Sequence, residues 1–189
     1  MILHTGMRTD IPAFYAPWLA NRLRAGEVCV RNPYDAAQVT RYLLDPRVVD
    51  LIAFCTKNPA PLLAHGEALT PFRQFWGVTV TPYGTDIEPQ APSVEAAMES
   101  IRTLAHVVGS RAVHWRYDPV LITEKYTLEF HTSAFRRMAE GLAGVVENCV
   151  VSFVDLYKKT KRNFPSLREV HAEERLALGE VFAASGREF

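Results

Sequence analysis

Short apolar runs alternate with helical patterns along this chain. Five runs, rich in β-branched and aromatic residues, each end in a cluster of polar residues, and a helix signal follows. Runs of this length and composition are typical of buried strands in a parallel sheet. The five predicted strands cover residues 2–7, 48–55, 75–80, 112–115 and 149–154.

The helix signals are clearest in the middle of the chain. Apolar residues at 94, 97, 98, 101, 104, 105 and 108 form one helical stripe. Ser93 is the expected N-cap of this helix, and Gly109 is the expected stop. A second helix is predicted over about residues 127–143, before Gly144.

Two further helices are predicted near the two ends of the sequence. One helix is expected between residues 11 and 25, where Pro12 and Pro17 leave its first residue open. The last helix is predicted to begin at Ser166, because Glu169 follows it at the spacing of a capping box, and to end near Gly186.

Strands that alternate with helices predict right-handed βαβ units and a parallel sheet. The expected fold class is α/β: a partial or open TIM-like (β/α) barrel of about five units in a single domain, 1–189. Residues 27–44 are expected to form an inserted β-hairpin with its turn at residues 32–35. Because a closed barrel takes about 250 residues, the chain is expected to be truncated by about three units.

Polar residues follow the predicted strands, where parallel α/β barrels carry their functional groups. Side chains alternate along a strand, so His114, Arg116 and Asp118 should share one face, and Val113, Trp115 and Tyr117 should pack under the helices. The predicted catalytic residues are Asp10, Lys57, Asp118 and Asp155. The predicted ligand-binding residues are Arg8, Thr81, Tyr83, Arg116 and Lys158. Arginine and lysine beside carboxylates suit a small polar or anionic ligand.

Structural roles compete with these assignments. Asp10 would also serve as a helix N-cap, and Asp118-Pro119 as a turn. The arginines and aspartates would also form structural ion pairs, Arg8 with Asp118 and Arg116 with Asp10. The basic run 158–162 is typical of a solvated loop. His4 and His114 are interpreted as core residues, and His65, His106, His131 and His171 as ordinary surface or helix residues.

Charge and cysteine usage narrow the protein class. There are 21 basic and 21 acidic residues, so the net charge is zero, which argues against bulk attraction to nucleic acid or a membrane surface. No apolar run is long enough to span a bilayer, and no signal peptide precedes the first strand. The three cysteines, Cys29, Cys55 and Cys149, form neither a disulfide framework nor a metal clip, and no metal site is predicted. These features indicate a cytoplasmic protein.

The polar loops resemble an uncharacterised bacterial family, a domain of unknown function whose longer members are similar to radical-SAM barrel proteins. The matching segments span nearly the whole chain: residues 8–15, 30–33, 56–61, 81–89, 115–119 and 152–160. The resemblance implies a four-iron cluster and S-adenosylmethionine in the longer members, held at a C-terminal cysteine cluster. This chain ends at Phe189 without such a cluster, so no cofactor is expected for it.

Three hypotheses of function follow. The first is the N-terminal, substrate-facing part of a radical-SAM-like barrel enzyme without its iron–sulfur motif. The second is a small anionic-ligand-binding module or metal-independent enzyme, and the third is a non-catalytic remnant with structural loops. The sequence leaves open whether the chain is an enzyme. Open edges of an unfinished sheet further predict self-association.

Overall fold

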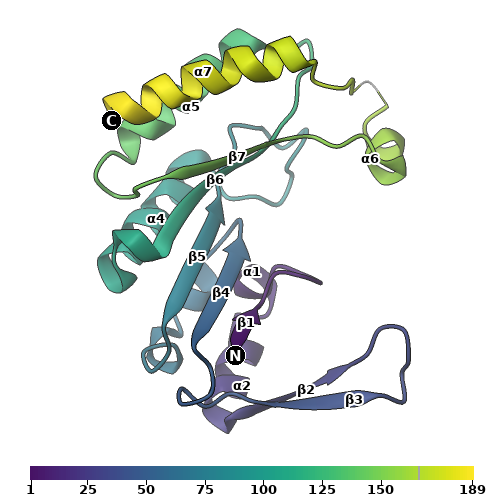
Figure 1. Ribbon diagram of the computed structural model, residues 1–189, viewed down its shortest axis with the longest axis vertical. Helices are drawn as coiled ribbons and strands as arrows, with labels where there is room; N and C mark the ends of the chain where they lie inside the picture. Colours follow the sequence, from purple (N-terminus) through teal and green to yellow (C-terminus); the bar gives the residue numbers. More distant parts are fainter. Residues whose placement is uncertain (166) are drawn as a thin grey trace. The chain divides into compact units, whose positions relative to one another are not determined.

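The computed structural model describes residues 1–165 and 167–189, which form two compact units, Met1–Val78 and Thr79–Phe189. The fold is mixed α/β, and its parallel strands follow the order β1-β4-β5-β6-β7, an order compatible with an open α/β fold (Figure 1). The five strands correspond to the five apolar runs of the sequence, so the predicted parallel α/β class is confirmed.

The first unit contains three parallel strands and short helices. β1 pairs with β4 from Ile2 opposite Leu51, and β4 pairs with β5 from Ile52 opposite Gln74. Its elements are β1 (Ile2–His4), α1 (Ile11–Phe14), α2 (Ala16–Ala25), β2 (Glu27–Arg31), β3 (Val39–Leu43), β4 (Leu51–Thr56), α3 (Ala60–Leu63), the 3-10 helix η1 (Gly66–Ala68) and β5 (Gln74–Thr79).

Aromatic stacking and α2 form the core of this unit. Phe54 of β4 and Trp76 of β5 are buried, and their ring centroids lie 4.0 Å apart in a stacked arrangement. α2 buries Leu19 and Leu23 at the i, i+4 spacing of one helical face. Such a face is stabilised by the removal of apolar surface from water.

The predicted hairpin is present in the first unit. β2 and β3 pair antiparallel, with Glu27 opposite Leu43 and Arg31 opposite Val39. Asn32 begins the connection: its backbone N–H donates to the carbonyl of Gln38 (2.9 Å), and its side-chain oxygen accepts from the N–H of Tyr34 (2.9 Å). An Asx turn of this kind explains why the Asn-Pro pattern reverses the chain here.

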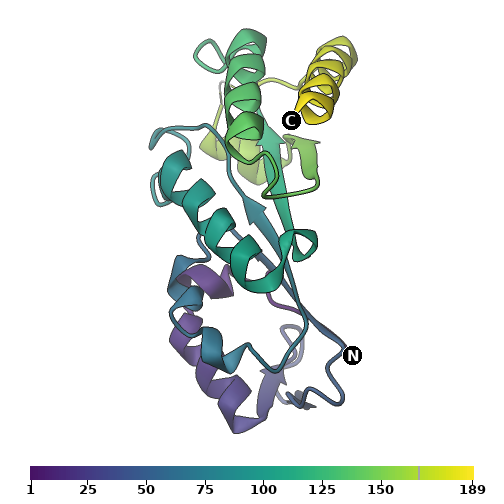
Figure 2. The same ribbon diagram turned by 90° about the vertical axis from the view of Figure 1, so that its left-hand side faces the viewer.

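The second unit contains two parallel strands and the longer helices. α7 lies beside α5, as Figure 2 shows in yellow and green. The elements are α4 (Val94–Val108), the 3-10 helix η2 (Ser110–Ala112), β6 (Val113–Val120), α5 (Leu128–Gly141), β7 (Cys149–Phe153), α6 (Lys158–Asn163) and α7 (Ala172–Glu188). No helix in the described ranges is both long and apolar enough to cross a membrane.

An aromatic cluster under the helices forms the core of the second unit. Trp115 and Tyr117 of β6 are buried, as the alternation of side chains along a strand predicts. Arg116 and Asp118 on the other face stay partly exposed. Trp115 stacks on Phe135 of α5 at 4.8 Å, and Phe135 stacks on Phe182 of α7 at 4.1 Å. These rings join strand and helices through large apolar contacts.

Several predicted boundaries change in the structure. β1 ends at His4, whereas β6 continues through Pro119 to Val120, beyond the end at residue 115 that the sequence predicts. The predicted helix start at Ser166 lies outside the described residues. The last helix begins at Ala172, and the carboxylate of Glu174 accepts from the backbone N–H of His171 (2.9 Å), so the capping contact lies five residues beyond the predicted one.

The α4 boundaries confirm the cap that the sequence predicts. The Ser93 hydroxyl accepts from the N–H of Ala96 (3.2 Å), and Gly109 ends the helix with a φ of 88°. We expect Ser93→Ala to lower the free energy of unfolding by about 1 kcal/mol, because the Ala96 N–H loses its partner. Ser100→Ala, within the same helix, is the control and should change stability little. Chemical denaturation measures both; equal effects would contradict the capping role.

Candidate functional site

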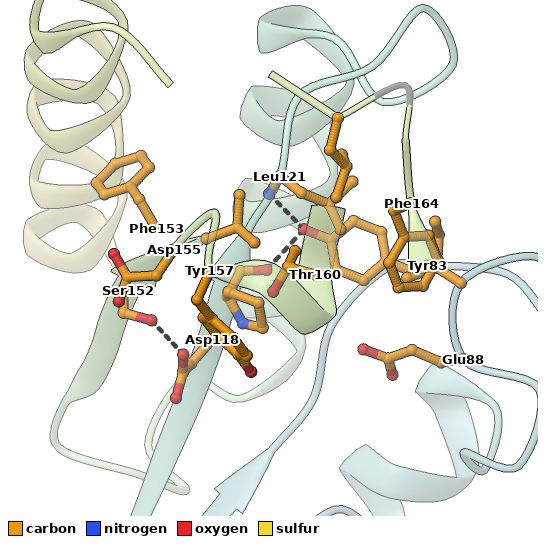
Figure 3. Close-up of a pocket in the computed structure, with 14 residues that line it drawn as sticks. Tyr83, Glu88, Asp118, Leu121, Ser152, Phe153, Asp155, Tyr157, Thr160 and Phe164 are labelled. Carbon is orange, nitrogen blue, oxygen red and sulfur yellow. Dashed lines mark hydrogen bonds between the residues drawn. The ribbon is translucent and has the colours of Figure 1, made fainter. Parts of the chain in front are cut away.

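A cavity of about 340 Å³ lies at the carboxyl ends of β6 and β7, within the second unit (Figure 3). In parallel α/β folds this end of the strands is where ligands bind. We call it the β6–β7 pocket. Its walls are Tyr83, Ile87, Glu88, Asp118, Pro119, Leu121, Ser152, Phe153, Val154, Asp155, Tyr157, Thr160, Phe164 and Leu167.

A bulge in β6 aims Asp118 at the neighbouring strand. Tyr117 pairs with Val151 and Val120 pairs with Phe153, so two residues of β6 face the single residue Ser152 of β7. Bulges re-aim side chains in this way. The Ser152 hydroxyl donates to one carboxylate oxygen of Asp118 (Figure 3). The other oxygen pairs with Arg116, two residues earlier on β6.

Tyr83 fixes the backbone that follows this bulge. Its hydroxyl donates to the carbonyl of Pro119 (2.7 Å) and accepts from the N–H of Leu121 (3.0 Å). The residue is buried, and burial raises the pKa of Tyr83, so the phenol stays protonated. Both bonds occupy the hydroxyl. Tyr83 therefore contributes its ring to the β6–β7 pocket and its hydroxyl to the shape of the strand end.

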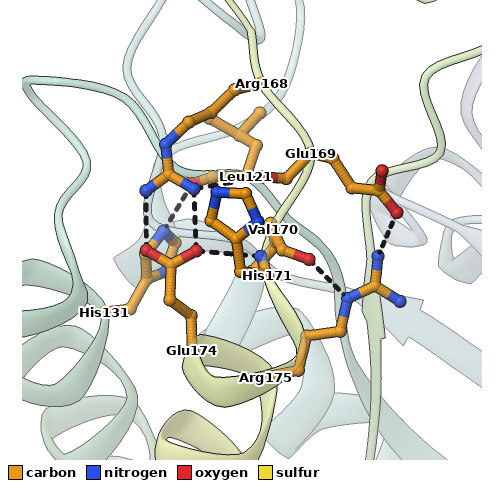
Figure 4. Close-up of polar contacts among 8 residues, drawn as sticks. All are labelled: Leu121, His131, Arg168, Glu169, Val170, His171, Glu174 and Arg175. Carbon is orange, nitrogen blue, oxygen red and sulfur yellow. Dashed lines mark hydrogen bonds and ion pairs between the residues drawn. The ribbon is translucent and has the colours of Figure 1, made fainter.

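His131 binds the same segment of backbone. Its Nε2 lies 2.9 Å from the carbonyl of Leu121 (Figure 4), and its Nδ1 lies 2.7 Å from the hydroxyl of Tyr117. Burial lowers the pKa of His131, which favours a neutral ring that donates from Nε2 and accepts at Nδ1. His131 is a residue of helix α5, as predicted, but it is not a surface residue, because its ring is fully buried. Its spacing to Phe135 and Met138 on one face of α5 is a signal for burial.

Ion pairs at the start of α7 hold the segment that completes one wall. Arg168 contacts both carboxylate oxygens of Glu174, at 2.7 and 2.6 Å, and this lowers the pKa of Glu174 to about 2 (Figure 4). Arg175 donates to the carbonyl of Val170 (2.8 Å), and its guanidinium lies over the ring of Phe153. Phe153 and the nearby Leu167 both line the pocket.

Carboxylates are the charged groups in the described wall of the pocket. They are Glu88, Asp118 and Asp155. Glu88 accepts from the hydroxyl of Thr81 (2.8 Å). Asp155 is exposed, and its side chain makes no hydrogen bond or ion pair within the part of the chain that the structure describes. Asp155 is thus the wall carboxylate that is available to a ligand.

Of the predicted site residues in this unit, Tyr83, Asp118 and Asp155 line the pocket together. Thr81 and Arg116 lie outside the lining, but each contacts a carboxylate of the pocket wall. Thr81 contacts Glu88, and Arg116 contacts Asp118. Lys158 is an exposed residue of α6 outside the lining. The sequence interpretation missed Glu88, Ser152, Tyr157 and Thr160; only their places in the loops after predicted strands, or at a strand end, could have indicated them.

The other three predicted residues belong to the first unit. The carboxylate of Asp10 accepts from the N–H of Ala13 (3.0 Å) as the cap of α1, and also from the N–H of Lys57 (2.9 Å). It therefore joins the segments that follow β1 and β4. Arg8 donates to the carbonyl of Arg31 (3.1 Å). The convergence of these three residues with the predicted site residues of the second unit stays a prediction.

The contacts of Tyr83 generate a stability prediction. Tyr83→Phe should lower the free energy of unfolding by about 1–3 kcal/mol, because the N–H of Leu121 and the carbonyl of Pro119 lose a partner. Tyr157→Phe is the matched control, since Tyr157 is exposed and should change stability little. Urea denaturation measures both variants. A Tyr83→Phe protein as stable as the control would contradict the role assigned to this hydroxyl.

Comparison with known proteins identifies a family. A family model described as "Domain of unknown function (DUF1848)" matches residues 2–189. No curated protein and no solved structure matches the chain. Because the match covers almost the whole sequence, the chain belongs to the DUF1848 family of unknown function.

Proposed function

We propose that the chain binds a small polar molecule with hydroxyl or amine groups in the β6–β7 pocket. The observation that carries this proposal is the wall of three carboxylates, Glu88, Asp118 and Asp155, at the carboxyl ends of parallel strands. Carboxylates accept hydrogen bonds from hydroxyl and ammonium groups and repel anions. A cavity of about 340 Å³ is within the range of small-molecule sites.

The two aspartates have different surroundings and would have different roles. Asp118 is held by Arg116 and Ser152, so it is a fixed acceptor that orients a ligand. Asp155 is exposed and has no protein partner among the described residues, so it can approach a ligand proton directly. If the chain is an enzyme, Asp155 is the candidate general base, and Asp118 is a binding group.

The family resemblance extends the proposal. It would make this pocket the substrate-facing part of a radical-SAM-like barrel enzyme, with the parallel strands as part of an open TIM-like barrel. The cysteines described here do not fit an iron–sulfur cluster. Burial raises the pKa of Cys149 to about 12, Cys29 lies exposed on β2, and no described group of three or more metal-ligating side chains converges. No step of the proposal therefore passes through such a cofactor.

The remaining hypotheses predict other outcomes. A module for anionic ligands would need cations in the wall, whereas Lys158 lies outside it. A non-catalytic remnant would bind nothing in the pocket. Self-association through the edges of the sheet stays a prediction of its own and does not require the pocket.

Glucosamine, glucose and glucose 6-phosphate test the proposal, because they share a scaffold and differ in charge. Ligand-observed NMR should detect the amine or the neutral sugar in preference to the phosphate. Asp155→Asn should weaken binding of glucosamine about tenfold to a hundredfold, the loss expected for one charged hydrogen bond. The same comparison with ethanolamine, ethylene glycol and glycolate extends the test to a smaller scaffold.

Glu124→Gln is the matched control, because Glu124 is an exposed carboxylate of the same unit outside the pocket. It should leave binding unchanged. Preference for the anion in both series, equal losses in the two variants, or no binding in either series would overturn the proposal.

A further inference from the structure

A second cavity, of about 470 Å³, lies within the first unit. It is bounded by the loop after β1, by α2 and by β2, elements that Figure 1 shows near one another. We call it the α2–β2 pocket. The residues that matter for its chemistry are Arg8, Tyr15, Trp18, Cys29 and Arg31.

Two aromatic side chains line this pocket and are not buried in the core. Trp18 is 45% exposed and Tyr15 is 50% exposed. α2 buries Leu19 and Leu23 instead. Neither Tyr15 nor Trp18 stacks on another ring within the described ranges, so both leave apolar surface open to solvent. A tryptophan face in a cavity is a stacking surface for a planar ligand.

Two arginines also line this pocket. Arg8 and Arg31 both line the pocket, and Arg8 donates to the main-chain carbonyl of Arg31 (3.1 Å), which holds it against the end of β2. No carboxylate lines the pocket, and neither arginine forms an ion pair with any described residue. The pocket therefore carries positive charge without a protein counter-charge, although the whole chain is neutral.

We propose that the α2–β2 pocket binds a small planar aromatic anion of about the size of a nucleoside monophosphate. The ring of the ligand would stack on Trp18 and Tyr15. Its anionic group would pair with Arg8 and Arg31, since guanidinium matches phosphate and carboxylate in a bidentate manner. This site is separate from the β6–β7 pocket and does not depend on the function proposed for it.

Trp18 provides a direct signal for binding. The chain has three tryptophans, and the other two, Trp76 and Trp115, are 0% and 2% exposed. Acrylamide quenching therefore reports mainly on Trp18. AMP should protect Trp18 from quenching and should bind at least tenfold more tightly than adenosine, which lacks the anion, or ribose 5-phosphate, which lacks the ring.

Cys29 provides a second signal that does not depend on fluorescence. It is exposed and lines the pocket, so bound AMP should slow its alkylation, measured on the Cys29 peptide by mass spectrometry. Trp18→Leu should weaken this protection at least fivefold. Arg31→Gln should reduce the preference for AMP over adenosine, because Arg8 alone then pairs with the anion. Arg24→Gln, which removes an exposed charge of α2 outside the pocket, should leave it unchanged.

Each contrary result is decisive. Equal affinity for AMP and adenosine would show that the pocket does not recognise the anionic group. Equal affinity for AMP and ribose 5-phosphate would show that it does not recognise the aromatic ring. Either result would overturn the proposal. If AMP, UMP and indole-3-carboxylate at millimolar concentration all leave Trp18 quenching and Cys29 alkylation unchanged, the α2–β2 pocket is not a site for aromatic anions.

Discussion

A buried polar chain determines how β6 ends, and the β6–β7 pocket depends on it. The hydroxyl of Tyr117 binds His131, His131 binds the carbonyl of Leu121, and the N–H of Leu121 binds Tyr83. Each group would be costly to leave unpaired in the interior. These hydrogen bonds therefore set the path of the backbone after the bulge. The bulge in turn presents Asp118 to Ser152 at the pocket wall.

Local patterns made much of this architecture predictable. The alternation along residues 113–118 gave the buried and open faces of β6, and Ser93 with Gly109 gave both ends of α4, because these depend on neighbours in sequence. The bulge at Asp118 and the hydrogen bond from Ser152 to Asp118 could not be predicted in this way. They arise from register against β7, which is set by contacts more than 30 residues away.

The placement of charged side chains in the fold could not be predicted from the sequence either. The sequence has 21 acidic and 21 basic residues, and it gave no reason to expect separate acidic and basic cavities. Within the second unit, folding gathers Glu88, Asp118 and Asp155 in one wall. Within the first unit, it places Arg8 and Arg31 in another. The expectation of an anionic ligand therefore suits the α2–β2 pocket better than the β6–β7 pocket, where carboxylates favour hydroxyl or amine groups.

The protonation state of His131 tests the account most directly. ¹⁵N NMR of the ring should show the Nε2–H tautomer and a neutral imidazole at pH values below 6.5, its ordinary pKa. Because the unfolded chain then binds the proton and the folded chain does not, the contribution of His131 to stability is complete above pH 6.5 and decreases as the pH falls through that value. A ring that carries its proton on Nδ1, or that titrates near 6.5 in the folded protein, would contradict the buried polar chain.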